Sequence, residues 1–390
     1  MALFDRGEYL ARLEKTKKRM AEAGIDVLLT VDPANMFYLS GYDGWSFYVH
    51  QVLIVAAQQE EPVWIGRGQD ANGAKVTTFL DHKNILGYPD DYVQSTVKHP
   101  MDFVADHLRS RGWDKGVVGV EMDGYYFTAA AHGSLQRNLP NARFKDATSL
   151  VNWVRIVKSK GELVYMRQAA VIMERVMARA IDGIVPGKRQ CDLVAEILDA
   201  QTRGTPEFGG EYASIVPMLP TGKGSSAPHL TWSDDRFKSG EMTIFELAAV
   251  RHRYHCPLAR TVYLGKVPQK MADAAKVVTE GLSAALDAAK VGARASDVEA
   301  AWRQTIAKSG IKKDSRIGYS IGVAYPPDWG EHTVSLRPID QTVLQQDMTI
   351  HCIPGVWFDD WGIEISEPFV VTPSGGQPFC SVPRQLFVKE

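Results

Sequence analysis

Short apolar runs and amphipathic stretches alternate along the N-terminal part of the chain. The apolar runs typical of buried strands are 25–31, 52–57, 62–66 and 116–121. The stretches with helical periodicity are 7–24, 100–111 and 127–137. This order predicts an α/β domain with a mixed sheet over residues 1–155.

The pattern changes after a short charged hinge near Lys160, which marks the predicted domain boundary. A long amphipathic helix follows within 152–184. Further helical stretches are 189–203, 268–290 and 295–309. The strand-like segments are 212–219, 242–250, 259–265, 348–358, 362–372 and 384–390. Residues 160–390 are therefore predicted to form an α+β domain in which helices pack on one side of a curved antiparallel sheet.

The charge balance and the apolar content exclude several classes of protein. Lys and Arg total 44, Asp and Glu total 46, and no basic run stands out, so nucleic-acid binding is not expected. No apolar stretch reaches the length of about 18 residues that a transmembrane helix needs, and the charged N-terminal segment lacks the apolar core of a signal peptide. The four cysteines form no CxxC pair, which is typical of reduced thiols. We expect a cytoplasmic protein that does not bind a membrane.

Four segments in the second half of the chain carry the clearest functional signal. They are "TGKGSSAPH" (221–229), "FELAAVRHRYHCPLART" (245–261), "GYSIGVAYPP" (318–327) and "IPGVWF…GIEISEPFVVT" (353–372). Each is weakly specific alone. Together and in this order they resemble the pita-bread metallopeptidase superfamily, which includes prolidase, aminopeptidase P, methionine aminopeptidase and creatinase. The resemblance covers nearly the whole chain and implies a creatinase-like N-terminal domain followed by a pita-bread catalytic domain.

The resemblance also implies a particular metal site. The metallopeptidases hold two divalent metals with two Asp, one His and two Glu, because hard dications need clustered carboxylates. In this chain the matching positions carry Glu246, Pro257, Tyr319, Ile353 and Ser366, the last flanked by Glu364 and Glu367. Proline and isoleucine side chains cannot coordinate a metal. We therefore expect no metal and no other cofactor.

Two stretches indicate a metal-free branch of the superfamily. Creatinase, its metal-free member, uses a His and carboxylates to hydrolyse a C–N bond, and the chain has His229 and Glu246 at the corresponding positions. Residues 253–265 and 318–338, the latter with its "YPPDWGE" run, are most similar to ectoine hydrolases. This resemblance implies hydrolysis of ectoine, a cyclic amidine that carries a carboxylate, to N-acetyl-L-2,4-diaminobutyrate, without fixing the product isomer.

The chemistry of an amidinium suits these residues. A buried carboxylate pairs with the cation and attacks its electrophilic carbon, which makes Glu246 the candidate nucleophile. His229 is the candidate proton carrier. Glu364 or Glu367 is expected to hold the second amidine nitrogen, and an arginine such as Arg260 is expected to hold the substrate carboxylate.

Aromatic and polar side chains are expected to close the substrate pocket. The candidates in the third motif and just after it are Tyr319, Tyr325, Asp328 and Trp329. The aromatic segment 35–48 adds Tyr38, Tyr42, Trp45 and Phe47, which suit cation–π contacts to an amidinium. In creatinase-like dimers the N-terminal domain of one subunit borders the active site of its neighbour. The resemblance therefore also implies a homodimer.

Each assignment has a structural alternative. His229 follows a Ser/Pro loop and fits a turn cap, and Glu246 fits a structural salt bridge with Arg260. Tyr319 and Trp329 fit core packing, and "YPPDWGE" fits a Pro-rich turn whose acidic residues are solvated. The alternative functions are creatinase or another C–N hydrolase of a small cation, a residual Xaa-Pro metallopeptidase, and a non-catalytic protein that binds a partner.

Overall fold

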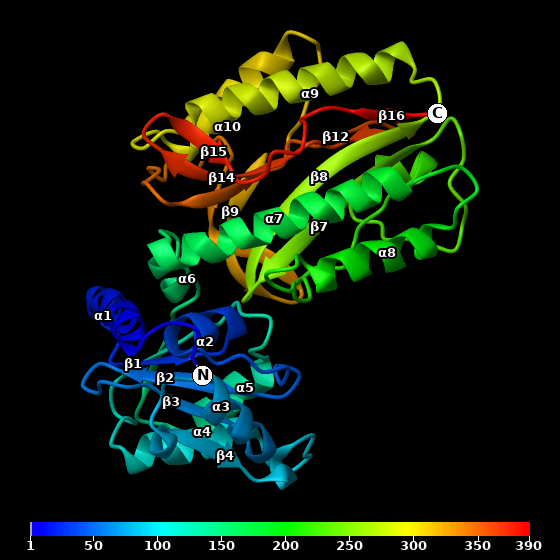
Figure 1. Cartoon of the computed structure of the whole chain (residues 1–390). Helices are drawn as coiled ribbons and strands as arrows, with labels where there is room; N and C mark the ends of the chain where they lie inside the picture. The colour runs from blue at the N-terminus through cyan, green and yellow to red at the C-terminus, as the bar shows by residue number, and fades with distance from the viewer. Residues whose placement is uncertain (1) are drawn as a thin grey trace. The chain divides into compact units, whose positions relative to one another are not determined.

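The computed structural model describes residues 2–390, which divide into two compact units (Figure 1). The first unit ends at Arg155 and the second is Ile156–Glu390, a division beside the boundary expected from the charged hinge. Each unit has its own sheet and its own hydrophobic core.

The N-terminal unit is built on a six-stranded mixed sheet. Its strands are β1 (Val27–Thr30), β2 (Val52–Ala56), β3 (Val63–Arg67), β4 (Ile85–Tyr88), β5 (Val117–Val120) and β6 (Arg143–Asp146). The order is β4-β3-β2-β1-β5-β6. β2 is antiparallel to both β1 and β3, whereas the pairs β1–β5, β5–β6 and β3–β4 are parallel. The predicted mixed α/β sheet is confirmed.

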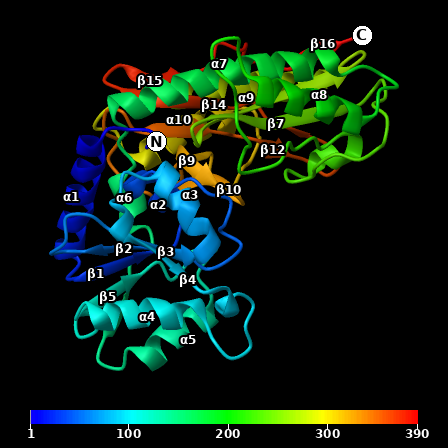
Figure 2. The same cartoon turned by 60° about the horizontal axis from the view of Figure 1, so that its bottom comes forward.

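Helices cover both faces of this sheet. They are α1 (Arg6–Glu22), α2 (Pro33–Ser40), α3 (Ala71–Thr77), α4 (Pro100–Ser110), α5 (Ala129–Asn138) and α6 (Leu150–Val154), with the 3₁₀ turns η1 (Gly68–Asp70), η2 (His82–Asn84) and η3 (Asp90–Tyr92). Successive strand side chains point to opposite faces. Leu28 therefore packs with α1, α2, α3 and α6, whereas Val27 and Leu29 pack with α4 and α5. Figure 2 shows α2 and α3 on one side of the sheet and α4 and α5 on the other.

The C-terminal unit contains an eight-stranded sheet. Its strands are β7 (Met242–Arg251), β8 (Tyr254–Leu264), β9 (Gly318–Tyr325), β10 (Asp328–Ser335), β11 (Thr349–Cys352), β14 (Glu367–Thr372), β15 (Gly375–Pro378) and β16 (Phe387–Lys389). The main path is β15-β14-β11-β9-β8-β16, with β10 paired to β9 and β7 paired to β8. All these pairs with an assigned register are antiparallel except β16–β8, which is parallel. A separate ladder joins β12 (Val356–Trp357) to β13 (Gly362–Ile363).

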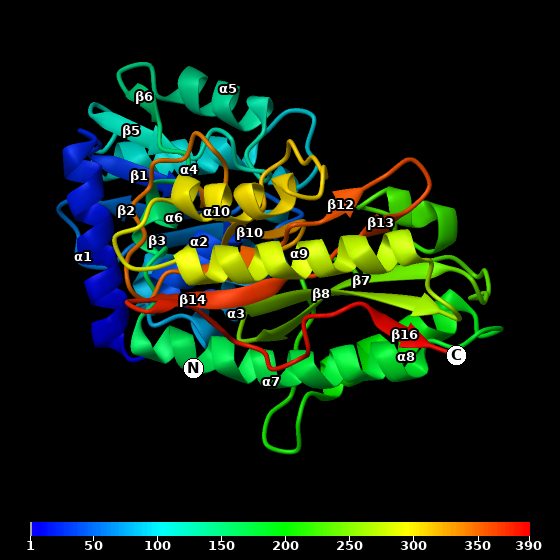
Figure 3. The ribbon, with the colours of Figure 1, turned by 90° about the horizontal axis from the view of Figure 1, so that it is seen from above.

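The helices of this unit form two packed pairs. They are α7 (Lys160–Gly183) with α8 (Gln190–Arg203), and α9 (Gln269–Ala288) with α10 (Ala295–Ala307); the 3₁₀ helix η4 (Gly222–Ser226) lies in a loop. α7 begins at a capping box in which the side chains of Ser159 and Glu162 each accept from the other's backbone N–H. Figure 3 shows α7 and α9 running along the sheet. The predicted α+β domain with a curved antiparallel sheet is confirmed.

One face of the β7–β8 hairpin packs against the helices α7 and α8. Phe245 and Leu247 of β7 and Leu258 of β8 are buried in one core cluster with residues of α7 and α8. Because strand side chains alternate, Glu246 points to the opposite face of the hairpin. The helices therefore cover one face, and the candidate nucleophile lies on the other.

The segment 212–219, expected as a strand, forms no regular strand. Only Met218 pairs, in an isolated bridge with Glu246. Pro217 has no N–H to donate to a ladder, and Ile215 and Pro217 line an apolar hollow beside α8 instead. The apolar content of this segment reflects packing and not strand pairing.

The "YPPDWGE" run is more than a solvated turn. Pro326 and Pro327 connect β9 to β10, and Asp328 already belongs to β10. Glu331 is buried and forms an ion pair with Lys158, with 2.7 Å between Nζ and Oε2. The run therefore turns the chain and also buries a charge.

The sequence led us to expect no transmembrane helix and reduced cysteines. No helix within residues 2–390 combines the length and the apolar content needed to cross a membrane. All four cysteines are free thiols, and Cys256, Cys352 and Cys380 are buried.

Candidate active site

Glu246 lies on the face of the β7–β8 hairpin that points away from α7 and α8. The two strands are joined by a two-residue turn in which His252 and Arg253 have φ values of 48° and 66°. This turn sets the register in which Glu246 pairs with Ala259. On the other edge of β7 the backbone of Glu246 exchanges two hydrogen bonds with Met218, both 3.1 Å long. These contacts fix the backbone that carries the carboxylate.

A second carboxylate, Glu364, lies close enough to Glu246 for the two charges to interact. The backbone of Glu364 is bound to β8 through Thr261. The Glu364 N–H donates to Thr261 Oγ1 at 3.0 Å, and this hydroxyl donates to the Glu364 carbonyl at 2.8 Å. Only 6% of Glu246 and 3% of Glu364 are exposed, so both acids are removed from bulk water.

Burial and mutual repulsion favour the protonated forms of this pair. Burial, with the charges of Glu364 and Asp328, raises the pKa of Glu246 well above its usual value. Burial also raises the pKa of Glu364 to about 7, although the ammonium group of Lys313 opposes this shift. Glu364 is therefore the first of the two acids to ionise. Near neutral pH the protein without a ligand keeps a proton on Glu246.

Lys313 is a buried cation that the sequence motifs did not indicate. It is 7% exposed; its Nζ donates to the Gly355 carbonyl at 2.6 Å and lies 4.6 Å from the centroid of the Trp357 ring. Burial lowers the pKa of Lys313 to about 8, against the influence of Glu364. Gly355 also borders Glu364, because a Cβ at Gly355 would lie 2.7 Å from Glu364 Oε1. The ammonium group and the carboxylate thus flank one backbone segment.

A chain of buried and half-buried hydrogen bonds ends at the hydroxyl of Tyr319. Trp329 Nε1 donates to Tyr319 Oη at 2.8 Å, and His351 Nδ1 lies 3.3 Å from the same oxygen. His351 Nε2 lies 2.7 Å from Ser366 Oγ, which accepts from the Ala259 N–H at 2.7 Å. The network joins β8, β9, β10 and β11 to the segment that precedes β14.

Arg260 and Glu367 form a buried ion pair apart from these residues. Arg260 follows Ala259 along β8, so its side chain points to the helix-facing side of the strand. It is fully buried and makes five hydrogen bonds, which use all five of its N–H groups. The acceptors are the Glu367 carboxylate at 2.6 Å and the carbonyls of Ala259, Ser366, Val382 and Pro383.

The sequence assigned Arg260 to the substrate carboxylate and left Glu367 as a candidate for the amidine. The structure corrects both assignments, because Arg260 has no N–H left for a ligand and Glu367 is its partner on the opposite face from Glu246. The alternative salt bridge between Arg260 and Glu246 is also not formed. Of the two acids of the last motif, Glu364 is the one that accompanies Glu246.

The other candidates of the third motif are held by protein contacts. Trp329 is fully buried in a small apolar cluster, so it packs in the core and is not an open wall. Asp328 Oδ2 lies 2.9 Å from Nε2 of His332. Tyr325 is 5% exposed, and its ring centroid lies 5.6 Å from the guanidinium carbon of Arg253. Among these three, Asp328 acts on Glu246 through its charge.

His229 lies in an exposed turn that follows η4. The loop is attached to β7 through the hydroxyls of Thr221 and Thr243, which are 3.1 Å apart. It is attached to β13 through Ser225 Oγ, which accepts from the Gly362 N–H at 3.4 Å. Across residues 2–390 the structure records no hydrogen bond or ion pair of the His229 imidazole, so its catalytic role stays a prediction.

The aromatic candidates of the N-terminal unit differ in exposure. Tyr38 in α2 is 2% exposed, and its ring centroid lies 4.3 Å from the guanidinium carbon of Arg12. Trp45 is 58% exposed and packs against Phe47, with 4.7 Å between ring centroids. Tyr38 therefore belongs to the core of its own unit, whereas Trp45 lies at the surface.

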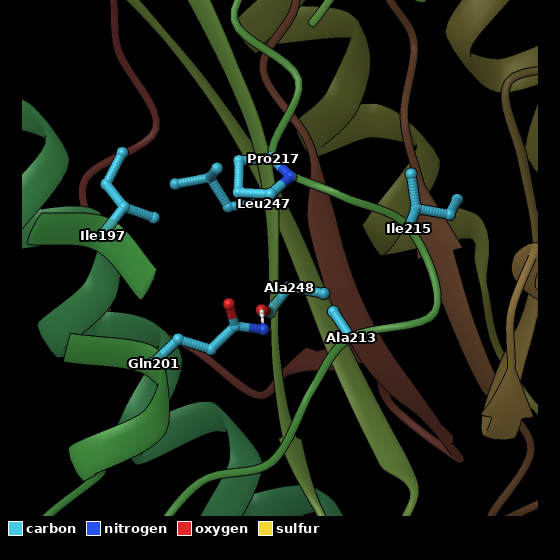
Figure 4. A pocket seen from close by; sticks show the side chains of 7 residues that line it. All are labelled: Ile197, Gln201, Ala213, Ile215, Pro217, Leu247 and Ala248. Atoms are coloured by element: carbon cyan, nitrogen blue, oxygen red, sulfur yellow. Dashed lines mark hydrogen bonds between the residues drawn. The ribbon is translucent and has the colours of Figure 1, made fainter. Parts of the chain in front are cut away.

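An apolar hollow lies between β7 and α8 (Figure 4). Its lining residues are Ile197, Gln201, Ala213, Ile215, Pro217, Leu247 and Ala248. The side-chain amide of Gln201 donates to the Ala248 carbonyl at 2.9 Å, which satisfies this backbone group. None of the lining residues is charged, so the hollow is not the place for carboxylate chemistry.

Comparison with known proteins identifies the family. Residues 12–157 match the creatinase/prolidase N-terminal domain. Residues 164–373, more than half of the chain, match metallopeptidase family M24. The chain belongs to family M24.

Relatives of this M24 chain are similar over nearly their full length. It is 51% identical to the ectoine hydrolase of Halomonas elongata, over 99% of this chain and 98% of that protein. It is 22% identical to the Xaa-Pro dipeptidase of Pyrococcus furiosus, over 96% and 99% of the two chains. Among solved structures, the dipeptidase PepE of Mycobacterium ulcerans gives a TM-score of 0.82 at 22% identity and 99% coverage of both chains. This last similarity supports the fold alone.

At the positions that the motif resemblance assigns to metal ligands, the M24 chain does not carry the full ligand set of a two-metal site. At the matching positions Pro257 and Ile353 have no donor atom, and Tyr319 and Ser366 belong to the hydrogen-bond network. Over residues 2–390, no three His, Cys, Asp or Glu side chains are grouped so that they could hold a metal ion. A two-metal centre therefore does not fit these residues.

Proposed function

We propose that this chain hydrolyses ectoine and opens its ring to N-acetyl-L-2,4-diaminobutyrate without a metal. The observation that carries the proposal is the pair of buried carboxylates, Glu246 and Glu364, in a site that has Pro257 and Ile353 at two ligand positions. A planar amidinium has N–H groups and one positive charge, which match two neighbouring carboxylates. The identity of 51% with the ectoine hydrolase of Halomonas elongata supports this choice of substrate.

The reaction needs a nucleophile and a proton carrier. Glu246 attacks the central amidinium carbon and forms a C–O bond; one ring nitrogen takes a proton, and its C–N bond breaks. Water then adds to the same carbon, releases the Glu246 carboxylate and leaves the acetyl group on the other nitrogen. His229 is the proposed carrier of the protons in both steps, and Glu364 pairs with the remaining nitrogen.

The substrate itself provides the positive charge that a metal provides in other hydrolases. A bound cation also lowers the pKa of both carboxyl groups, because it stabilises their ionised forms. Binding of an amidinium therefore expels the proton that the free protein keeps on Glu246. The carboxylate becomes a nucleophile when the substrate is in place.

Purified protein should convert ectoine to an acetylated diaminobutyrate at the same rate before and after exhaustive EDTA treatment. Mass analysis of the product measures this, and elemental analysis should find well below one metal per chain. A strong loss in EDTA that manganese or zinc restores would contradict metal independence. Hydrolysis of creatine or of an Xaa-Pro dipeptide, with none of ectoine, would replace the proposed substrate.

Lys313→Met should move the acidic limb of the kcat/KM profile to higher pH. The ammonium group opposes the burial that raises the pKa of Glu364 to about 7, so its removal raises this pKa further. A protonated Glu364 cannot pair with an amidinium. Activity should therefore fall, as the pH decreases, at a pH roughly one unit higher than in the parent.

The matched control for this profile is Lys312→Met. Lys312 is the exposed neighbour of Lys313, so its loss should leave the profile unchanged. An acidic limb that is the same in Lys313→Met and in the parent would show that this lysine does not set the charge of Glu364.

We infer that the protein is a homodimer. The match to the creatinase/prolidase N-terminal domain supports this, as do three exposed aromatic side chains of that unit. They are Trp45, Tyr48 and Tyr125, which are 58%, 65% and 62% exposed. Light scattering should give twice the chain mass of 43.2 kDa, from an interface of roughly 2,000 Å² or more. A monomer that is fully active at nanomolar concentration would contradict the dimer.

A further inference from the structure

The hydrogen bonds that lead to Tyr319 have a fixed direction. Ser366 Oγ accepts from the Ala259 N–H, so the Ser366 hydroxyl hydrogen is left to donate to His351 Nε2, 2.7 Å away. The reverse arrangement would bury this hydrogen without an acceptor. Burial, with the charge of Arg260, lowers the pKa of His351 to about 3, so the imidazole is neutral. Its single hydrogen must then be on Nδ1.

The direction of these hydrogen bonds also orients the Tyr319 hydroxyl. Its oxygen accepts from Trp329 Nε1 at 2.8 Å and from His351 Nδ1 at 3.3 Å. Both lone pairs are thereby used, and the hydroxyl hydrogen remains. In the described part of the chain no acceptor is recorded for it. Burial and the charge of Glu246 raise the pKa of Tyr319, so the hydroxyl stays protonated as a donor near this carboxylate.

A cation lies beside this donor. The guanidinium carbon of Arg316 is 4.6 Å from the centroid of the Tyr319 ring, and the side chain is exposed. Its charge acts on both Tyr319 and Asp328. Within residues 2–390 the structure records no hydrogen bond or ion pair of Arg316. A neutral donor and an unpaired guanidinium therefore stand next to each other.

We propose that Tyr319 and Arg316 together bind the carboxylate of the substrate. This rests on the proposed function, in which Glu246 and Glu364 take the amidinium. An amidinium presents only N–H donors, so it has no acceptor for the Tyr319 hydrogen. A carboxylate accepts from the hydroxyl and from the guanidinium at once. The two residues thus select cyclic amidines that carry a carboxylate.

The test compares two substrates, ectoine and the same tetrahydropyrimidine ring without its carboxylate. In Tyr319→Phe and in Arg316→Gln, kcat/KM for ectoine should fall by about 10- to 100-fold, the usual effect of losing a hydrogen bond to a charged group. The value for the ring without the carboxylate should change by less than about threefold, because that ring makes no such bond.

The matched controls are Tyr263→Phe and Arg203→Gln. The first removes a hydroxyl that donates to the Gly240 carbonyl, and the second removes an exposed arginine that pairs with Asp199 on α8. Both variants should leave the ratio of the kcat/KM values for the two substrates unchanged. Thermal melts establish that each variant is folded.

Equal losses on both substrates, or no loss, would overturn the proposal. If the parent hydrolyses neither ring, the proposed function fails instead, and calorimetric affinities for the two rings then test the carboxylate site by itself. NMR of protein labelled at the histidine nitrogens shows which nitrogen of His351 carries the hydrogen, and so the direction of the hydrogen bonds that lead to Tyr319. We expect the hydrogen of His351 on Nδ1, and a hydrogen on Nε2 would refute the derived orientation.

Discussion

Glu246→Gln should lower kcat for ectoine hydrolysis by about 10³-fold or more, the scale on which the loss of a catalytic nucleophile acts. The amide has nearly the shape of the acid, but it cannot attack the amidinium carbon or pair with its charge. The protein should stay folded, because within residues 2–390 the structure records no ion pair of this buried acid that the change would break. Steady-state ectoine hydrolysis, with a thermal melt of each protein, measures both effects.

The matched variant is Glu367→Gln. It makes the same chemical change three positions after Glu364, on the opposite face of the sheet. It weakens the buried pair with Arg260, so it should lower stability, by at most roughly 3–5 kcal/mol, and leave kcat near that of the parent. Turnover by Glu246→Gln within a few-fold of the parent would show that the covalent step is wrong. Glu364 would then be the next candidate.

His229→Ala should lower kcat by about 10²- to 10⁴-fold, the usual contribution of a general acid–base group. The imidazole is the proposed carrier of the proton to the departing ring nitrogen and of the proton from water. Its turn is exposed, so the substitution should not disturb the core. The measurement is steady-state hydrolysis with and without added imidazole, which should restore part of the rate if a proton carrier has been lost.

The control for this variant is His82→Ala. His82 is also exposed, but it lies in the N-terminal unit and should not affect turnover. Full activity of His229→Ala would mean that another group moves the protons. A loss of activity accompanied by a lower melting temperature, with no rescue by imidazole, would assign His229 a structural role.

Much of the fold could be predicted from periodicity. The long helices were predicted within a few residues of their ends, because amphipathic stripes and caps such as the Ser159–Glu162 box are local features. The strand predicted for residues 212–219 was wrong, because an apolar segment that covers a hollow has the same composition as a buried strand. Tertiary packing decides between them, and sequence does not show it.

The site was predicted less completely, because its geometry depends on strand register. The β7–β8 turn consists of His252 and Arg253, which lack the Asn-Gly signal of such turns. The sequence therefore did not show that Arg260 points away from the face of Glu246. Alternation decides which side chains meet, and it can be counted only once the turn is known.

Two cations were missed for a different reason. Lys313 and Arg316 lie in irregular chain between α10 and β9, outside the four motifs. Neither periodicity nor motif spacing applies to such a segment. The one available signal was that the carboxylate of the substrate needs a positively charged side chain. The sequence contains many arginines, and this signal does not choose among them.

Glu364 and Glu367 lie three positions apart on opposite faces of the sheet. Substitutions at these two positions should therefore occur independently of each other as relatives diverge. A replacement of Glu367 should be inherited together with a replacement of Arg260, because a buried charge left alone costs more than the loss of both partners. A replacement of Glu364 should be inherited with changes at Glu246 or Lys313, and with a new substrate. Specificity can thus drift on one face of the sheet while the architecture of the other is preserved.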